Sequence, residues 1–254
     1  MKKLINWKLF FILLAACVIA SFLVMPYTLA LTGNQTILTP VLLLASGIQS
    51  LIIFALAIFI GLLLSKKTGL GLPIIEGLLE GKNQKNKFKS ILLPSVILGL
   101  IAGVLIILLD ILFGSISVEM AEVETKIAPW MALLATFYGG IAEEVLCRLF
   151  LVTLFAWITT LIKKSKDGNP TNTGIWISIV LAAVLFGLGH LPATSQITPL
   201  TTVIVIRAIL LNGAGAMIFG WLYWKKGLES AMIAHFSADI VLHIIAPFIV
   251  SLIM

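Results

Sequence analysis

The 254 residues are 60% hydrophobic and only 11% charged, whereas about 25% of the residues in an ordinary soluble domain are charged. With a mean hydropathy of +1.15, this composition excludes a soluble globular protein and makes the lipid bilayer the main environment of the chain. The formal net charge of +6 comes from lysines scattered over short loops, so we expect no continuous basic surface for nucleic acid.

Seven apolar segments are each long enough to cross a bilayer as a helix, which takes about 20 residues. We therefore expect an all-α, polytopic transmembrane helix bundle with seven spans, eight being the alternative count. In chain order the expected spans are residues 9–31, 38–64, 91–114, 128–161, 174–191, 199–222 and 229–253.

The first segment also carries a pattern typical of a lipoprotein signal peptide, since two lysines and an apolar run lead to Leu-Ala-Ala-Cys17. The hydrophobicity continues past Cys17 to about Leu31, however, so a membrane span is the better interpretation. Cys17 and Cys147 lie in spans far apart in the sequence and match no metal or redox spacing. We expect both thiols to be buried by packing.

Residues 65–90 join the second and third spans through a short apolar stretch followed by a lysine-rich one. This composition predicts a short helix on the cytoplasmic surface of the membrane, with a solvated loop as the alternative. If the N-terminus is cytoplasmic, every lysine outside the spans faces the cytoplasm except Lys126. Because loops rich in lysine stay in the cytoplasm, this orientation is the one we expect.

The end of the sixth span carries three aromatic residues beside two lysines. Belts of tryptophan and tyrosine mark membrane interfaces. We therefore expect Trp221, Tyr223 and Trp224 to lie at the cytoplasmic interface.

Ionisable residues inside spans are costly in lipid, and each needs a partner or a function. In the fourth span, Glu144 and Arg148 are four residues apart and lie on one helix face, where they can pair. Glu143 is turned away by about 100° and can contact a different partner. We interpret Glu143 as a reactive carboxylate beside a structural ion pair; a purely structural salt-bridge cluster is the alternative.

In the fifth span, Phe186 and His190 share a face, and Gly187 and Gly189 are expected to allow close helix approach. Spans four and five form an antiparallel hairpin. At 1.5 Å per residue, Glu143 and His190 lie about 27 and 24 Å from its tip. These two side chains should therefore sit at nearly the same depth.

In the seventh span, His235 and Asp239 share a face, and His243 extends that stripe. His235 lies only about 10 Å into its span, so it meets the hairpin groups only if the hairpin tip projects into the cytoplasm. This places the site in the cytoplasmic half of the bilayer. In the outer halves of spans three and six, Asp110 and Arg207 are expected to form a structural pair.

The three patterns together resemble the CPBP family of intramembrane proteases, which includes the type II CAAX prenyl endopeptidases and the Abi proteins. The family pattern runs EExxxR, then FxxxH, then HxxxN or a close variant, on successive core helices. The three motifs in this order on apolar helices are specific to the family. The matching residues are Glu143, Glu144 and Arg148, then Phe186 and His190, then His235. The resemblance covers residues 128–245, and it departs from the better-known members at Asp239, where they carry asparagine.

This resemblance implies one bundle in which residues 128–254 form the catalytic helix core and residues 1–127 add N-terminal transmembrane helices. It also implies an intramembrane endopeptidase that hydrolyses a membrane-associated peptide or protein, with CAAX-type C-terminal processing as one such activity. Glu143 would activate the attacking water and His190 and His235 would assist. The full expected catalytic set is Glu143, Glu144, Arg148, His190, His235 and Asp239.

A divalent metal is an open alternative on this basis, because the resemblance leaves the family's need for a metal unsettled. Histidine and carboxylate side chains are suitable ligands for Zn²⁺. A carboxylate at residue 239 either orients His235 or acts as a metal ligand, and it makes a metal site more plausible than asparagine would. The candidate ligands for Zn²⁺ or another divalent metal are His190, His235, Asp239 and Glu143.

Two other functions remain open from the sequence. A non-catalytic membrane partner, such as a bacteriocin-immunity protein, would keep the fold without needing Glu143. A proton-coupled transporter would use the same groups as a proton relay, but the sequence has no inverted repeat or pair of broken helices. The expected partners are the lipid bilayer and a membrane-associated substrate, and the expected location is the cell membrane of a prokaryote. The sequence defines no oligomeric state.

Overall fold

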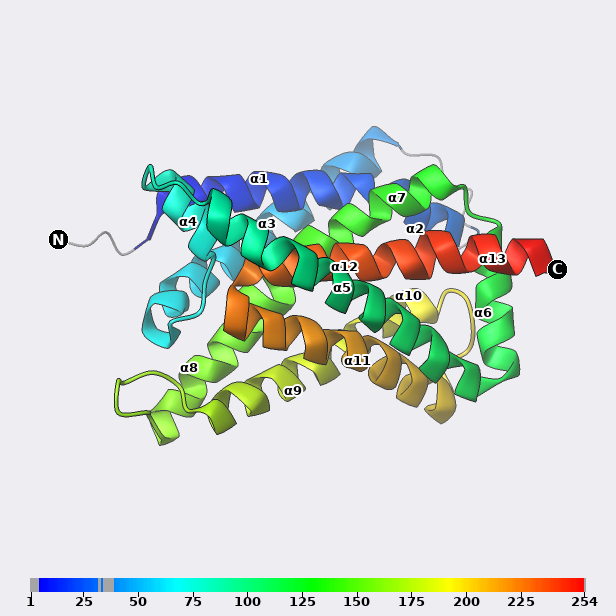
Figure 1. Cartoon of the computed structure of the whole chain (residues 1–254). Helices are drawn as coiled ribbons and strands as arrows, with labels where there is room; N and C mark the ends of the chain where they lie inside the picture. The colour runs from blue at the N-terminus through cyan, green and yellow to red at the C-terminus, as the bar shows by residue number, and fades with distance from the viewer. Residues whose placement is uncertain (1–4, 32, 34–38, 254) are drawn as a thin grey trace.

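The computed structural model describes residues 5–31, 33 and 39–253 and shows long helices packed side by side in one bundle (Figure 1). Seven helical segments in this part of the chain are long and apolar enough to cross a membrane. The predicted all-α bundle of seven spans is therefore confirmed, and the chain is an integral, multi-pass membrane protein. The spans are Trp7–Leu31, Pro40–Thr68, Lys85–Phe113, Pro129–Ile162, Asn172–Thr194, Thr202–Lys226 and Leu228–Leu252. The predicted start of the second span, residue 38, lies outside the described residues.

Most spans contain more than one helical element, because kinks, 3-10 turns or π-helical turns (labelled η) interrupt the α-helix. The α-helices are α1 Trp7–Leu23, α2 Met25–Leu31, α3 Pro40–Thr68, α4 Pro73–Leu79, α5 Lys85–Asp110, α6 Ser115–Thr125, α7 Pro129–Phe137, α8 Thr153–Ile162, α9 Asn172–Gly189, α10 Leu191–Thr194, α11 Thr202–Lys226, α12 Leu228–Ile240 and α13 Ala246–Ile253. The 3-10 turn is η1 Ile111–Phe113, and the π-helical segments are η2 Tyr138–Glu143, η3 Val145–Val152 and η4 Val241–Ile245.

Threonines begin three of the spanning helices. The side-chain oxygens of Thr39, Thr171 and Thr201 each accept a hydrogen bond from the backbone N–H three residues later, at the N-termini of α3, α9 and α11. This contact satisfies one of the N–H groups that have no partner within the helix. At its other end, α3 stops at Gly69, whose φ of 72° is the left-handed conformation that glycine adopts most easily.

Small residues let the spans pack closely around α11, which contacts α5, α9 and α12. Gly187 of α9 lies so close to the backbone of α11 at Ile209 that a side chain would not fit, as predicted. The same prediction is wrong for Gly189, around which nothing lies within 4 Å of where a Cβ would be. Gly99 of α5 packs in the same close manner against the backbone of α12 at Ala234.

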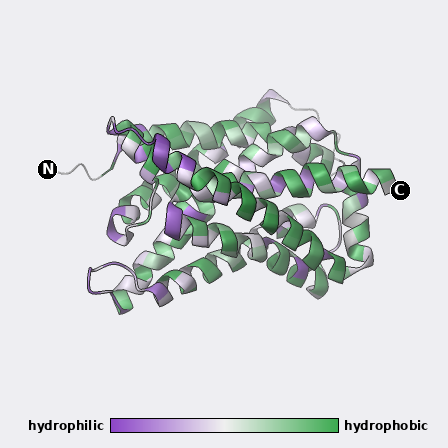
Figure 2. Cartoon of the chain, in the orientation of Figure 1, coloured by the Kyte–Doolittle hydropathy of each residue, from purple (hydrophilic) through white to green (hydrophobic). Residues whose placement is uncertain are grey.

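The hydrophilic residues collect at the end of the bundle that holds the described N-terminal residues, α4 and the loop between α8 and α9 (Figure 2). That loop reaches beyond the turn between α11 and α12, as the predicted projection of the hairpin requires (Figure 1). The expected surface helix is α4, but residues 85–90 already belong to α5. A lysine-rich helix end can extend out of the membrane without losing its backbone hydrogen bonds.

Glu229, at the start of α12, ties α4 to the core. Its Oε1 accepts hydrogen bonds from the backbone N–H groups of Ile74 and Ile75, both at 2.9 Å. The adjacent backbone N–H of Leu228 donates to the carbonyl of Gly71 at 3.0 Å. The short helix is thereby fixed to the hydrophilic end of the core helices.

Tyr223 packs into the protein core rather than on the outer surface of the bundle. Its side chain is fully buried, and its hydroxyl forms a 2.7 Å hydrogen bond with Thr153 of α8. Trp224, by contrast, is only partly buried, and the ammonium group of Lys225 lies 3.3 Å from the centre of its ring. The pattern of aromatic residues beside lysines could not separate the side of α11 that faces the core from the side that faces the interface.

Two further predictions about side chains within the spans are confirmed. Arg207 donates through Nε and Nη2 to the two oxygens of Asp110, at 2.7 and 2.8 Å, so α11 and α5 are joined by a bidentate ion pair. Cys17 and Cys147 are both free thiols and both buried.

Candidate functional site

The polar motifs of the fourth and seventh spans lie beside π-helical turns. Glu143 ends η2 and Glu144 precedes η3, while η4 follows Asp239 by two residues. A π-helical turn is wider than an α-helical one and is frequent at functional sites. Here these turns set the directions in which the two neighbouring glutamates leave the helix.

Glu144 is the centre of a buried ion pair, as predicted from its spacing to Arg148. Its Oε1 lies 2.9 Å from Nη1 of Arg148, an ion pair without hydrogen-bond geometry, and forms a 2.7 Å hydrogen bond with Nδ1 of His235. Nη2 of Arg148 donates to the backbone carbonyl of Ala216 at 3.3 Å. One carboxylate oxygen thus connects the fourth span to the seventh.

Aromatic rings enclose the charges of this ion pair. The guanidinium of Arg148 lies 5.3 Å from the ring centres of both Phe186 and Phe219. Phe219 also stacks on His235, with ring centres 4.7 Å apart. Such contacts stabilise a cation that has left water. Phe219 was missed by the sequence analysis, because an apolar residue in an apolar span carries no local signal.

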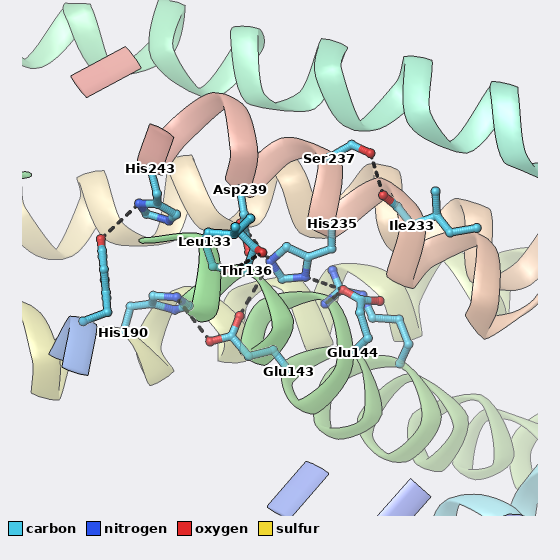
Figure 3. Close-up of polar contacts among 12 residues, drawn as sticks. Leu133, Thr136, Glu143, Glu144, His190, Ile233, His235, Ser237, Asp239 and His243 are labelled. Atoms are coloured by element: carbon cyan, nitrogen blue, oxygen red, sulfur yellow. Dashed lines mark hydrogen bonds and ion pairs between the residues drawn. The ribbon is translucent and has the colours of Figure 1, made fainter. Parts of the chain in front are cut away.

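Glu143 points toward two histidines from two other spans (Figure 3). Its Oε1 lies 4.0 Å from Nε2 of His190, and its Oε2 lies 3.7 Å from Nε2 of His235. These distances are too long for direct hydrogen bonds, but a water molecule or a substrate oxygen can contact both groups. Glu143 and His190 are 21% and 34% exposed, whereas Glu144 is fully buried. The more accessible face of the site is therefore the one between Glu143 and His190.

The hydrogen bonds to the ring nitrogens define the state of each histidine. Nδ1 of His190 lies 2.8 Å from the carbonyl oxygen of Phe186, which can only accept, so Nδ1 carries the proton. The ring of Phe186 contacts the His190 ring edge-on at 4.6 Å, as the shared helix face predicts. Nδ1 of His235 likewise donates to Glu144 when that carboxylate is ionised. In the neutral rings both Nε2 atoms are then acceptors that face Glu143.

Asp239 lies on the other side of the His235 ring from Glu144. Its Oδ1 is 3.5 Å from Nε2 of His235, and the residue is only 7% exposed. A Cβ at residue 139 would overlap with Oδ2 of Asp239 and would lie 3.2 Å from Nε2 of His235. The absence of a side chain at Gly139 therefore leaves the room in which Asp239 and His235 meet.

His243 does not reach Glu143 but belongs to a second polar group with Tyr27 of α2 and Glu124 of α6. Nδ1 of His243 is 3.1 Å from the Tyr27 hydroxyl and 3.1 Å from Oε2 of Glu124, and the Tyr27 hydroxyl donates to Oε1 of Glu124 at 3.2 Å. We call these three residues the Tyr27 cluster. Only His243 was noted from the sequence, because Tyr27 and Glu124 lie in segments far apart along the chain.

The structure brings all six predicted site residues together around His235 and Glu143. Among the described residues, no three or more histidine, cysteine, aspartate or glutamate side chains are arranged so that they could hold a metal ion. The predicted set of Glu143, His190, His235 and Asp239 is thus not placed as a ready ligand shell. The Zn²⁺ site remains a prediction.

Residues 125–241 match the family model described as type II CAAX prenyl endopeptidase Rce1-like. The matched range runs from the end of α6 to the start of η4 and contains every predicted site residue. The resemblance predicted from the three motifs is therefore confirmed over this range. Comparison with curated proteins and comparison with solved structures gave no match.

Proposed function

From this family match and the geometry around Glu143, we propose that the chain is a CAAX-type intramembrane endopeptidase in which Glu143 activates the attacking water. The observation that carries the proposal is the convergence of a partly exposed carboxylate with the Nε2 atoms of His190 and His235, from three different spans. A general base needs to reach both the water and a group that stabilises the reacting carbonyl. Glu143 and the two histidines provide these parts at one point.

In the proposed reaction, Glu143 accepts a proton from a water molecule as the water oxygen attacks the carbonyl carbon of the scissile peptide bond. The carbonyl oxygen becomes an oxyanion, and His190 or His235, in its protonated form, donates a hydrogen bond to it from Nε2. The proton on Glu143 then passes to the leaving nitrogen as the C–N bond breaks. The products are a carboxylic acid and an amine, and no further reactant is needed.

The remaining site residues position the reacting groups. Glu144 accepts a hydrogen bond from Nδ1 of His235, which fixes the plane of that ring and directs Nε2 to the more accessible face. Arg148 compensates the charge of Glu144 in an apolar environment. Asp239 approaches the opposite nitrogen of His235.

The position of the site suits a substrate that is itself held in the membrane. Glu143 and His190 lie within spans, and the more exposed side of the site is formed by their own spanning segments. A peptide attached to the bilayer by an apolar or lipidated C-terminal segment can reach such a site without leaving the membrane. We therefore propose CAAX-type C-terminal processing as the form of this activity, with access from the cytoplasmic leaflet.

A divalent metal is a separate part of the proposal. The neutral Nε2 atoms of His190 and His235 are acceptors and are chemically suitable as ligands, with Glu143 and Asp239 as oxygen donors. When bound, a metal would polarise the scissile carbonyl or its water. If zinc belongs to the site, purified active protein contains it and loses activity with a chelator. Active protein without bound metal, and insensitive to chelators, would contradict the metal part alone.

The test is an assay in which purified wild type and the Glu143→Gln variant, each in detergent or bilayers, are incubated with prenylated and unprenylated hydrophobic peptides. Cleavage products are detected by mass spectrometry. Glutamine keeps the shape of glutamate but cannot act as the base, so cleavage should disappear. Glu80→Gln is the matched control, because Glu80 is an exposed residue paired with Lys82 far from the site. A folded wild type that cleaves none of a broad peptide set would instead favour the non-catalytic membrane partner.

A further inference from the structure

We propose that Asn212 of α11 is a substrate-binding residue of the candidate active site, where its side-chain amide hydrogen-bonds the peptide backbone of a membrane-held substrate next to the scissile bond. This inference rests on the proposed function, because it names a contact that the substrate makes in the same site. It adds the sixth span to the fourth, fifth and seventh spans, which carry Glu143, His190 and His235.

The first observation is the face of α11 from which the Asn212 side chain extends. Phe219, whose ring stacks on His235, lies seven residues later in the same unbroken helix. Seven residues make almost two full turns, so the two side chains differ in direction by only about 20°. Between them, the carbonyl of Ala216 accepts a hydrogen bond from Arg148. Asn212 therefore extends from the side of α11 that contacts the site.

The second observation is the position of Asn212 at the contact between α11 and the fifth span. Nδ2 of Asn212 donates a hydrogen bond to the carbonyl of Ala208 at 2.9 Å. That carbonyl oxygen would lie 2.9 Å from a Cβ at Gly187 of α9, so the two helices approach closely at this point. Gly187 precedes His190 by three residues, and its carbonyl accepts a hydrogen bond from the backbone N–H of His190 at 3.2 Å. The amide of Asn212 therefore lies beside α9, about one helical turn from His190.

The third observation is that part of this amide is unused. An asparagine side chain offers one acceptor oxygen and two N–H donors. The carbonyl of Ala208 can only accept, so the amide nitrogen faces it and Oδ1 is left for another contact. In the part of the chain that the structure describes, Oδ1 of Asn212 has no hydrogen-bond partner, and the side chain is only partly buried. One acceptor and one donor thus remain for a ligand.

An amide with these free groups matches a peptide backbone. Each peptide bond of a substrate presents one N–H and one carbonyl, and both need partners inside a membrane. Because Asn212 is uncharged, it can hold the backbone beside His190 without competing with Glu143 for the proton that the proposed reaction transfers. Holding the peptide bond next to the scissile one keeps the reacting carbonyl within reach of the attacking water. Asn212 thereby supplies orientation rather than proton transfer.

The experiment compares a prenylated hydrophobic peptide with ester analogues in which one backbone N–H beside the scissile bond is replaced by oxygen while the scissile amide is kept. Each is offered to wild type and to Asn212→Leu, because leucine has nearly the size of asparagine but no polar side-chain atoms. For wild type, one analogue should lower kcat/KM by about tenfold, as expected for one lost hydrogen bond. Asn212→Leu should cleave the peptide about tenfold less efficiently and should not distinguish that analogue from the peptide.

Ser178→Ala is the matched control. The Ser178 hydroxyl donates to the carbonyl four residues earlier, as the Asn212 amide does, but Ser178 lies about 18 Å along α9 from His190. This variant should cleave the peptide and distinguish the analogues as wild type does. A folded Asn212→Leu that distinguishes the analogues as strongly as wild type would overturn the inference and leave the proposed protease function intact.

A binding measurement separates this inference from the proposed function. The Glu143→Gln variant, with and without Asn212→Leu, is titrated with the same prenylated peptide carrying a fluorescent label. Asn212→Leu should weaken binding by about tenfold, although neither protein cleaves the peptide. This weakening, together with a wild type that cleaves no peptide, would support the contact at Asn212 and contradict the protease function. Equal affinities of the two proteins would contradict the contact.

Discussion

At the residue scale, the site depends on how a few charges are neutralised away from water. Three carboxylates share His235 as a neighbour: Glu144 contacts one of its ring nitrogens, and Glu143 and Asp239 approach the other. The two adjacent glutamates have different surroundings: Glu144 is completely buried and paired with Arg148, and Glu143 is partly exposed. This difference is the reason why we propose Glu143, and not Glu144, as the carboxylate that transfers protons.

Replacing Arg148 with methionine should destabilise the protein strongly. The change leaves the fully buried Glu144 carboxylate without its cationic partner, and breaking a buried pair in this way costs about 3–5 kcal/mol. The double variant Glu144→Gln/Arg148→Met should be more stable than Arg148→Met alone, because no buried carboxylate remains unpaired. Unfolding in detergent measures both differences. Equal losses in the single and double variants would show that the cost lies in the lost packing of the arginine rather than in the charge.

Glu76 on α4 gives a pH dependence with a definite sign. Burial, and then the nearby carboxylate of Glu229, raises the pKa of Glu76 above its ordinary value of 4.5, against an opposing effect of Lys66. Because the pKa is higher in the folded state, the stability that this group contributes is present below 4.5 and is lost as the pH rises through the raised pKa. Glu76→Gln should therefore gain stability relative to wild type as the pH rises.

The measurement is the difference in unfolding temperature between Glu76→Gln and wild type at several pH values that run from about 4 to about 7, which includes the ordinary pKa of glutamate and the range above it. Glu80 is the control of opposite sign, because the hydrogen bond from Lys82 lowers its pKa. Its pair is exposed, so Glu80→Gln should cause only a small loss of stability, which is present near neutral pH and disappears as the pH falls. A difference for Glu76→Gln that does not change with pH would contradict the assignment.

Much of the site could be predicted at this scale because its contacts are local. Residues four apart on a helix are neighbours, and the pairs of Glu144 with Arg148 and of Phe186 with His190 follow from that spacing alone. The contacts of Phe219 and Tyr27 could not be predicted in this way. Each depends on how distant helices pack, and packing geometry leaves no periodic signal in one sequence.

At the element scale, interrupted helices position the reactive groups. The fourth span was expected to be one regular helix, and its length and ends are close to the prediction. Its centre, however, consists of π-helical turns between Tyr138 and Val152. In the seventh span, η4 changes the direction in which the side chains after Asp239 leave the helix. Hydropathy predicts where a span lies but not the number of residues in each of its turns. The exact directions of the side chains therefore had to come from the structure.

Gly139→Ala should reduce cleavage far more than it reduces stability. The added methyl group would press against Asp239 and His235, and a displacement of about 1 Å at a catalytic group can cost about 100-fold in rate. Gly213→Ala in α11 is the matched control, because nothing lies within 4 Å of its Cβ position and alanine suits a helix. It should keep wild-type activity. Similar kinetics for the two variants, both correctly folded, would contradict the proposed role of the space at Gly139.

At the scale of the whole molecule, the distribution of lysines and the apolar spans define an orientation. Because the number of spans is odd, the first and the last described residues of the chain lie on opposite sides of the membrane. The hydrophilic end of the bundle carries α4 and the loop between α8 and α9. The rule that lysine-rich loops stay in the cytoplasm assigns this end to the cytoplasm. The fourth span then runs inward and the fifth span runs outward.

This orientation predicts opposite accessibility for two introduced cysteines. Asp167 is exposed in the loop between α8 and α9, and Gln196 is exposed after α10, at the other end of the bundle. A membrane-impermeant maleimide should label Asp167→Cys only from the cytoplasmic face of sealed vesicles and Gln196→Cys only from the outer face. The wild type is a suitable background, because its two thiols are buried. Labelling of both variants from the same face would contradict a fifth span that crosses the membrane between them. Labelling of each variant from the face opposite to the expected one would reverse the orientation of the protein. The proposed substrate access would then be from the outer leaflet.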